Sequence, residues 1–193
     1  MPNGRQHETI NLVSFVALGS GYAFARSQGL LETRPLLTSM SLLSSFSVSY
    51  VLGTFLVTPD LDLAENRVRA KGHWGILGWL WVPYGKLFSH RGRSHTWFVG
   101  PFTRLAYLAI LGVFGLTCAA LIASALGRGL RLQTQVSRYW FEIGLGIIFG
   151  YYISQWFHLL ADGVFPWHGH SLRRRRSGSK RRARKRKSRK RAR

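Results

Sequence analysis

Residues 105–127, LAYLAILGVFGLTCAALIASALG, decide the fold, because they contain no charged side chain over a length that can cross a membrane. A second uncharged stretch of similar length covers residues 36–57. A bilayer core about 30 Å thick is crossed by about 20 apolar residues in a helix, and backbone polar groups in lipid must be satisfied within the segment. Both stretches are therefore predicted to be transmembrane helices, and an ordinary soluble globule is excluded.

Two less uniform stretches extend this pattern. Residues 9–25 are apolar but short, and residues 139–161 are aromatic-rich with a polar residue near each end. The four segments together predict an all-α, polytopic membrane helix bundle with about four transmembrane helices. A signal peptide is the competing interpretation of the first segment, because Ala23, Phe24 and Ala25 form a small-residue cleavage pattern.

The C-terminal end of the chain has a different composition from the rest. Of the 28 Lys and Arg residues in the 193-residue chain, 15 lie in Arg173–Arg193, which contains no acidic residue. Like-charge repulsion and the lack of apolar groups predict disorder there. We therefore expect a membrane domain over residues 1–170 and a disordered polybasic tail over residues 171–193. The tail is expected to bind anionic lipid headgroups, with nucleic acid or an inert solubilising role as alternatives.

The distribution of basic residues predicts the orientation. Four spans place both termini and the loop 58–104 on one side of the bilayer, and that side carries eight Lys and Arg residues against five on the other, even without the tail. The positive-inside rule then predicts a multi-pass integral membrane protein with both termini in the cytoplasm. The single cysteine, Cys118, excludes a disulfide framework or a Cys-based zinc finger.

Two local patterns suggest how the bundle packs. Residues 73–87, HWGILGWLWVPYGKL, are rich in Trp but too short to cross a bilayer, so they fit either an interfacial segment or a turn buried over the helix ends. Gly146 and Gly150 form a Gly-x-x-x-Gly pair, which permits close approach of two membrane helices.

Ionisable side chains cluster at the predicted cytoplasmic ends of the spans, where they need a partner or a purpose. Imidazole nitrogens and carboxylate oxygens together bind zinc, manganese or iron(II), so the cluster predicts a site for one or two divalent transition-metal ions, with zinc as the first candidate. His158 and Asp162 share one helix face, and Asp60 and Asp62 fit a turn or an extended segment that directs both carboxylates into one pocket. The predicted metal ligands are His7, Asp60, Asp62, His90, His95, His158 and Asp162.

Each of these residues also has an ordinary structural interpretation. A histidine near a membrane interface is often only an interfacial polar residue, and an aspartate after proline is often a turn former. Glu8, next to His7, fits either an outer carboxylate of the site or an exposed residue at a helix start. His73, His168 and His170 are left outside the predicted set. The joint placement at several helix ends is what favours a metal site.

The short motifs GRQH at 4–7, TPDLD at 58–62, HRGRSH at 90–95 and HLLAD at 158–162 also carry a family resemblance. The chain resembles uncharacterised metal-binding membrane proteins of the kind common in cyanobacteria, and is similar to inner-membrane metal-dependent hydrolases with P-D-x-D and H-R-G-x-[ST]-H signatures. The resemblance covers residues 1 to about 165, and it implies that the seven predicted ligands are the family's metal-site positions.

A metal-dependent hydrolase is the function that these residues favour. In that hypothesis one of Asp60, Asp62 and Asp162 orients or deprotonates the attacking water, while Arg91 and Arg93 bind an anionic, phosphoester-type substrate. The alternative for the two arginines is contact with lipid phosphate. Two other classes stay open: a non-catalytic metal-binding membrane protein, and a membrane anchor whose tail binds polyanions.

Overall fold

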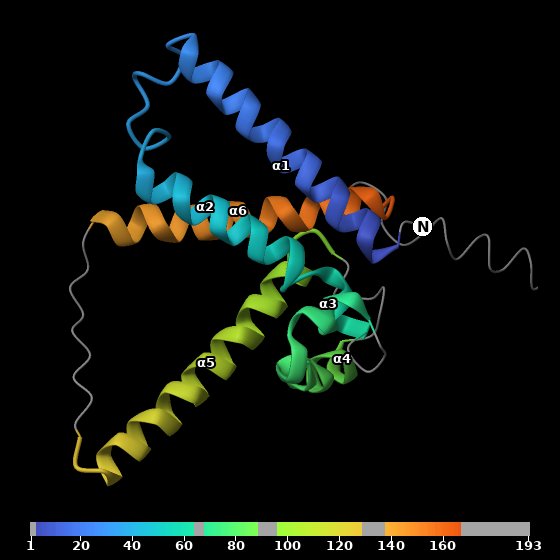
Figure 1. Ribbon diagram of the computed structural model, residues 1–193, viewed down its shortest axis with the longest axis vertical. Coiled ribbons are helices and arrows are strands. Elements are labelled where there is room, and N and C mark those ends of the chain that lie inside the picture. Colours follow the sequence, from blue (N-terminus) through green and yellow to red (C-terminus); the bar gives the residue numbers. More distant parts are fainter. Residues whose placement is uncertain (1–2, 64–67, 89–95, 129–137, 167–193) are drawn as a thin grey trace, which may run out of the picture. The chain divides into compact units, whose positions relative to one another are not determined.

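The computed structural model describes residues 3–63, 68–88, 96–128 and 138–166, and the described part is all-helical (Figure 1). Residues 1–162 form one compact unit. The tail and the predicted site residues His90, Arg91, Arg93 and His95 lie outside the described residues. The helices are α1 (Gly4–Ser27), α2 (Met40–Phe55), the 3₁₀ helix η1 (Pro59–Leu63), α3 (Arg69–His73), the 3₁₀ helix η2 (Gly75–Trp81), α4 (Val82–Leu87), α5 (Val99–Ala125) and α6 (Arg138–Ala161).

Three helical segments of the described chain are long and apolar enough to cross a membrane: Met40–Leu63, Val99–Ala125 and Tyr139–Ala161. They correspond to three of the four predicted spans. The fourth, α1, is a helix of 24 residues but is not among these three. Its first turns carry polar side chains, and two of them, His7 and Asn11, are buried against other helices.

Helices α2 and α6 make the most extensive helix contact, and they run side by side in Figure 1. Glycines make this approach possible: a Cβ on Gly146 would lie 2.5 Å from the carbonyl oxygen of Leu42, and one on Gly150 would lie 2.9 Å from the carbonyl carbon of Phe46. Ser49 Oγ donates a hydrogen bond across the seam to the carbonyl oxygen of Ile147, at 2.9 Å. The predicted close approach at Gly146 and Gly150 is therefore confirmed.

Polar side chains attach α1 to this pair. Asn11 Nδ2 donates to the backbone carbonyl of Ser154 at 3.2 Å, and Tyr50 Oη donates to the carbonyl of Asn11 at 3.0 Å. Asn11 and Tyr50 are both fully buried, where an unsatisfied polar group would be costly. These bonds bring the beginning of α1 to the last turns of α6.

The start of α1 is fixed by a capping box. Asn3 Oδ1 accepts a bond from the Gln6 backbone N–H at 3.0 Å, and Gln6 Oε1 accepts one from the Asn3 backbone N–H at 2.7 Å. The Asn3 carbonyl also accepts from the His7 N–H. We expect Asn3→Ala to lower the free energy of unfolding by about 1 kcal/mol, because an N-cap side chain is lost. Thermal unfolding of the two proteins in one detergent measures this, and an unchanged midpoint would contradict it.

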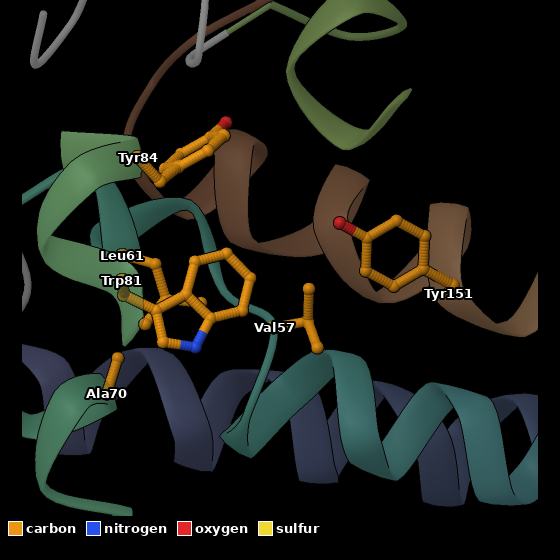
Figure 2. Packing of buried hydrophobic residues seen from close by; sticks show 6 residues of the cluster. All are labelled: Val57, Leu61, Ala70, Trp81, Tyr84 and Tyr151. Carbon is orange, nitrogen blue, oxygen red and sulfur yellow. The ribbon is translucent and has the colours of Figure 1, made fainter. Parts of the chain in front are cut away.

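The segment between α2 and α5 folds over a small aromatic core (Figure 2). Trp81 and Tyr84 are fully buried there, and Trp74 Nε1 donates to the carbonyl of Leu56 at 2.7 Å. Trp79 points outward and is 61% exposed. The buried-turn interpretation of residues 73–87 thus holds for Trp81 and Tyr84, and the interfacial one stays a prediction for Trp79. The core consists of Val57, Leu61, Ala70, Trp81, Tyr84 and Tyr151.

Helix α5 begins six residues earlier than the uncharged stretch from which it was predicted. The added turns include Arg104, which is fully buried and whose Nη1 donates to Gln155 Oε1 of α6 at 3.0 Å. Leu105, Tyr107 and Leu108 still pack against the aromatic core, but no residue of the most apolar stretch of α5 is buried within the protein. An all-round apolar, uncovered helix is typical of a lipid-facing span.

Candidate metal centre

The last turn of α6 and the first turn of α1 bring two histidines face to face. His7 and His158 are both buried, and their rings stack with centroids 4.0 Å apart and planes inclined by 8°. His7 is held by the capped start of α1, and His158 lies just beyond the residues of α6 that bond Asn11. Residues 151 positions apart in the sequence therefore form one buried pair.

Carboxylates border the histidine pair on two sides. Asp162 lies one turn beyond His158, and its Oδ1 is 3.4 Å from His7 Nε2 while its Oδ2 is 3.8 Å from His158 Nε2. Asp60, from η1, places its Oδ1 3.8 Å from His158 Nε2. One ligand atom from each of His7, His158 and Asp162 lies within 4.8 Å of the others. Among the described residues this is the group that could hold a metal ion.

The spacing of these atoms fits an ion better than direct hydrogen bonds. An N–H···O bond spans about 2.7–3.2 Å, which is shorter than all three nitrogen–oxygen separations. Ligands held about 2.0–2.1 Å from a tetrahedral ion lie about 3.4 Å from one another. The separation between His7 and Asp162 matches this value, and the two separations from His158, at 3.8 Å, are longer. Within the described chain, His158 Nε2 and His7 Nδ1 are buried and have no hydrogen-bond partner. Buried polar atoms are normally satisfied, so the donor set fits a divalent cation.

A pocket opens beside the histidines. It encloses about 240 Å³ of empty space, including its mouth, and its walls come from α1, the end of α2, η1, α3 and α6. Asp60 is the more exposed of the two carboxylates near His158, with 28% of its side chain accessible. The residues that line the pocket are Gly4, His7, Glu8, Thr54, Thr58, Asp60, Arg69, Ala70 and His158.

Glu8 and Arg69, which line this pocket, form a polar cluster with His73. Arg69 Nε donates to both carboxylate oxygens of Glu8, at 2.7 and 2.8 Å, and His73 Nε2 lies 2.9 Å from Glu8 Oε1. Partial burial alone would raise the pKa of Glu8, but the hydrogen bonds and charges of Arg69 and His73 outweigh it and hold that pKa below its usual value. Glu8 is therefore an anionic anchor that joins α1 to α3.

The structure sorts the predicted site residues into three groups. His7, Asp60, His158 and Asp162 come together. Asp62 is buried but does not line the pocket, and its charge acts on Tyr84 of the aromatic core. The remaining predicted residues are His90, Arg91, Arg93 and His95, which lie outside the described residues.

Arg69 and His73 were not among the predicted site residues. No spacing rule links them to Glu8, which is more than 60 positions earlier in the chain. The one available signal was the position of Glu8 beside His7, which made an outer carboxylate one of its two interpretations.

An all-helical protein with membrane-length apolar helices and a buried His/Asp group suited to a cation is the class that this geometry defines. Comparison with protein families agrees with it. The chain belongs to the family described as uncharacterized metal-binding protein (DUF2227), which matches residues 2–172. All residues of the centre fall within that match.

One relative comes from Aquifex aeolicus (strain VF5) and is itself described only as an uncharacterized protein. It is 40% identical to this chain over 63 residues, which are 33% of this chain and 43% of the relative. The alignment thus spans less than half of that relative's length. No solved structure matches the chain.

Proposed function

We propose that this protein is an integral membrane metal-dependent hydrolase. The observation that carries the proposal is the buried meeting of His7, His158 and Asp162 beside an open pocket. Two buried histidines that each have one ring nitrogen without a hydrogen-bond partner, next to carboxylates, are arranged for a cation rather than for packing alone. The pocket is open to solvent, so a water can reach that cation.

Zinc is the first candidate ion, and manganese and iron(II) are the alternatives. Two imidazoles and one or two carboxylates suit all three, and the 3.4 Å separation between His7 Nε2 and Asp162 Oδ1 is compatible with the tetrahedral preference of zinc. A divalent ion with an open position supplies water with a lowered pKa and polarises a phosphoryl or carbonyl oxygen. A second ion would need ligands beyond the four residues gathered here.

The protein's own groups have separable roles in this proposal. His7, His158 and Asp162 hold the ion, and their burial keeps bulk water away from it. Asp60 faces the pocket from η1, so its Oδ1 is placed to accept a proton from an attacking water. Glu8, through Arg69, keeps α3 against the start of α1 and so shapes the mouth of the pocket.

The rival in this class is a metal-binding membrane protein without catalysis. Coordination separates the two, because a structural zinc site is closed by four protein ligands, whereas a catalytic site keeps a position for water. The pocket beside His158 and the exposed edge of Asp60 favour the open form.

Metal analysis of the detergent-purified full-length protein tests the proposal. We expect about one equivalent of a divalent transition metal, and hydrolysis of a small phosphoester that a chelator abolishes and zinc restores. Asp60→Asn should retain the metal and lose most of the turnover, because only the proton acceptor is removed. Protein that binds no transition metal would end the proposal, and bound metal without turnover on any phosphoester would favour the non-catalytic rival.

The orientation and the tail remain part of the proposal. We place both termini in the cytoplasm, where the polybasic tail would meet anionic lipid headgroups at about 1 kcal/mol per basic residue. Nucleic acid is the competing partner for the tail.

A further inference from the structure

The pocket beside the metal centre contains a buried hydroxyl group that the metal scheme leaves unused. Thr58 is 5% exposed, and within the described chain its Oγ1 is buried without a hydrogen-bond partner. It lines the pocket together with Asp60 and His158. Thr54, which lines the same pocket, differs, because its Oγ1 already donates to the carbonyl of Tyr50. An unsatisfied buried hydroxyl in a pocket wall indicates a ligand with polar atoms.

Arg69 contributes a cation to the same pocket. Both of its side-chain hydrogen bonds with described residues are made by Nε to Glu8, so the terminal nitrogens of the guanidinium make none with that part of the chain. Its stem rests on Gly4, where a Cβ would meet Arg69 Cβ at 3.4 Å. Glu8 therefore orients the guanidinium through Nε, while 44% of the Arg69 side chain stays exposed and its terminal nitrogens can reach a ligand, which suits the planar geometry that arginine uses for oxyanions.

We infer that Thr58 and Arg69 form an anion subsite for a phosphate group next to the metal. The inference rests on the proposed function, because the pocket also contains the carboxylates of Glu8 and Asp60 and would repel an anion without a cation. A divalent ion held by His7, His158 and Asp162 would add positive charge beside the cavity, to which Arg69 already contributes. Thr58 Oγ1 then donates a hydrogen bond to one phosphate oxygen and the terminal nitrogens of Arg69 donate to others.

The size of the cavity limits the ligand to a small group. The volume of about 240 Å³ includes open solvent at the mouth, so the enclosed part is much smaller. A ligand can therefore place only a small terminal group at the pocket, and in this inference that group is a phosphate, either free or at the end of a larger molecule that stays outside. The substrate class is therefore a phosphomonoester, carried either by a soluble molecule or by a lipid headgroup.

Binding of inorganic phosphate to the zinc-loaded full-length protein in detergent tests the subsite. Isothermal titration is carried out at high ionic strength, which screens the polybasic tail, and metal content is measured on the same samples. We expect Arg69→Gln to weaken phosphate binding about ten- to a hundredfold, and Thr58→Val about three- to tenfold, from the usual values of charged and neutral hydrogen bonds. Thr58→Ser, which restores the hydroxyl, should recover most of the loss.

Matched controls isolate the pocket from the rest of the chain. Arg34→Gln removes a positive charge from the exposed connection between α1 and α2, and Thr117→Val removes a hydroxyl that bonds only within α5. Both should bind phosphate like the parent protein. Micelles containing phosphatidic acid form a second arm: displacement of the bound phosphate identifies a lipid headgroup as the source, and its persistence identifies a soluble phosphomonoester.

The possible results distinguish the phosphate subsite from the proposed metal centre. If Arg69→Gln and Thr58→Val both retain the metal and bind phosphate as the parent does, the phosphate subsite is overturned. The proposed metal centre is not affected by that result. Metal retained with phosphate binding lost in both supports the subsite. A parent protein that takes up no metal overturns the proposed function and, with it, the subsite that depends on the cation.

Discussion

His158→Ala is expected to weaken metal binding by more than about a hundredfold. The substitution removes the imidazole that lies between His7, Asp60 and Asp162, so the remaining donors lose their common neighbour. Loss of an outer partner of a metal ligand already costs about 10- to 100-fold in affinity, and loss of a ligand itself should exceed that. Competition with a chromogenic chelator measures the affinity, and metal analysis after dialysis measures retention.

The unfolding midpoint provides a second measurement, because ligand binding and stability are linked. An ion that binds only the folded state raises its stability, so a chelator should lower the unfolding midpoint of the parent protein and leave that of His158→Ala unchanged. His73→Ala is the matched control, because its imidazole contacts Glu8 and none of the four gathered residues. It should retain the ion, with at most about a tenfold loss. Equal metal content in His158→Ala and the parent would place the ion elsewhere in the chain.

Gly150→Ala is expected to destabilise the protein by more than about 3 kcal/mol. Its new Cβ would collide with the backbone of Phe46 and with Ser49 Oγ, and a backbone cannot move aside as a flexible side chain can. Overpacking a close-packed interior typically costs about 1–3 kcal/mol, and a clash with main-chain atoms belongs at or above the upper end. Unfolding by a denaturing detergent, followed by circular dichroism, measures the change.

Gly144→Ala is the control on the same helix, and its expected effect on stability has the opposite sign. Nothing lies within 4 Å of the Cβ that this substitution adds. Alanine is favoured over glycine in a helix by about 0.5–1 kcal/mol, so the variant should be as stable as the parent or slightly more stable. A loss of similar size in both variants would mean that the contact between α2 and α6 is not the cause.

The membrane-length helices were largely predictable, because an uncharged run of the required length has few other interpretations. The limits of α6 agree with the predicted ones within one residue. The start of α5 was placed too late, because prediction stopped at Arg104, where a charge normally ends a span. A bond to Gln155 buries that charge inside the protein, and a single sequence does not show which distant amide will be its partner.

Part of the metal centre was also predictable from helix ends. The convergence of His7, His158 and Asp162 follows once α1 and α6 meet at one end, and the four-residue spacing of the last two fixes their common face. The different directions of the Asp60 and Asp62 side chains could not be predicted, because these residues form a 3₁₀ helix rather than a turn or an extended segment. With about three residues per turn, side chains two positions apart point in different directions. Asp60 lines the pocket and Asp62 does not.

The centre joins α1 to α6, two helices that lie far apart in the sequence, and this has a consequence for biogenesis. A ribosome delivers α1 long before α6, so a nascent polypeptide that stops in α5 carries His7 without His158 or Asp162. Metal capture at the proposed site would then follow insertion of α6, and products truncated before α6 could not acquire the ion through it. Occupancy by the cation would thereby mark chains in which α1 and α6 have met.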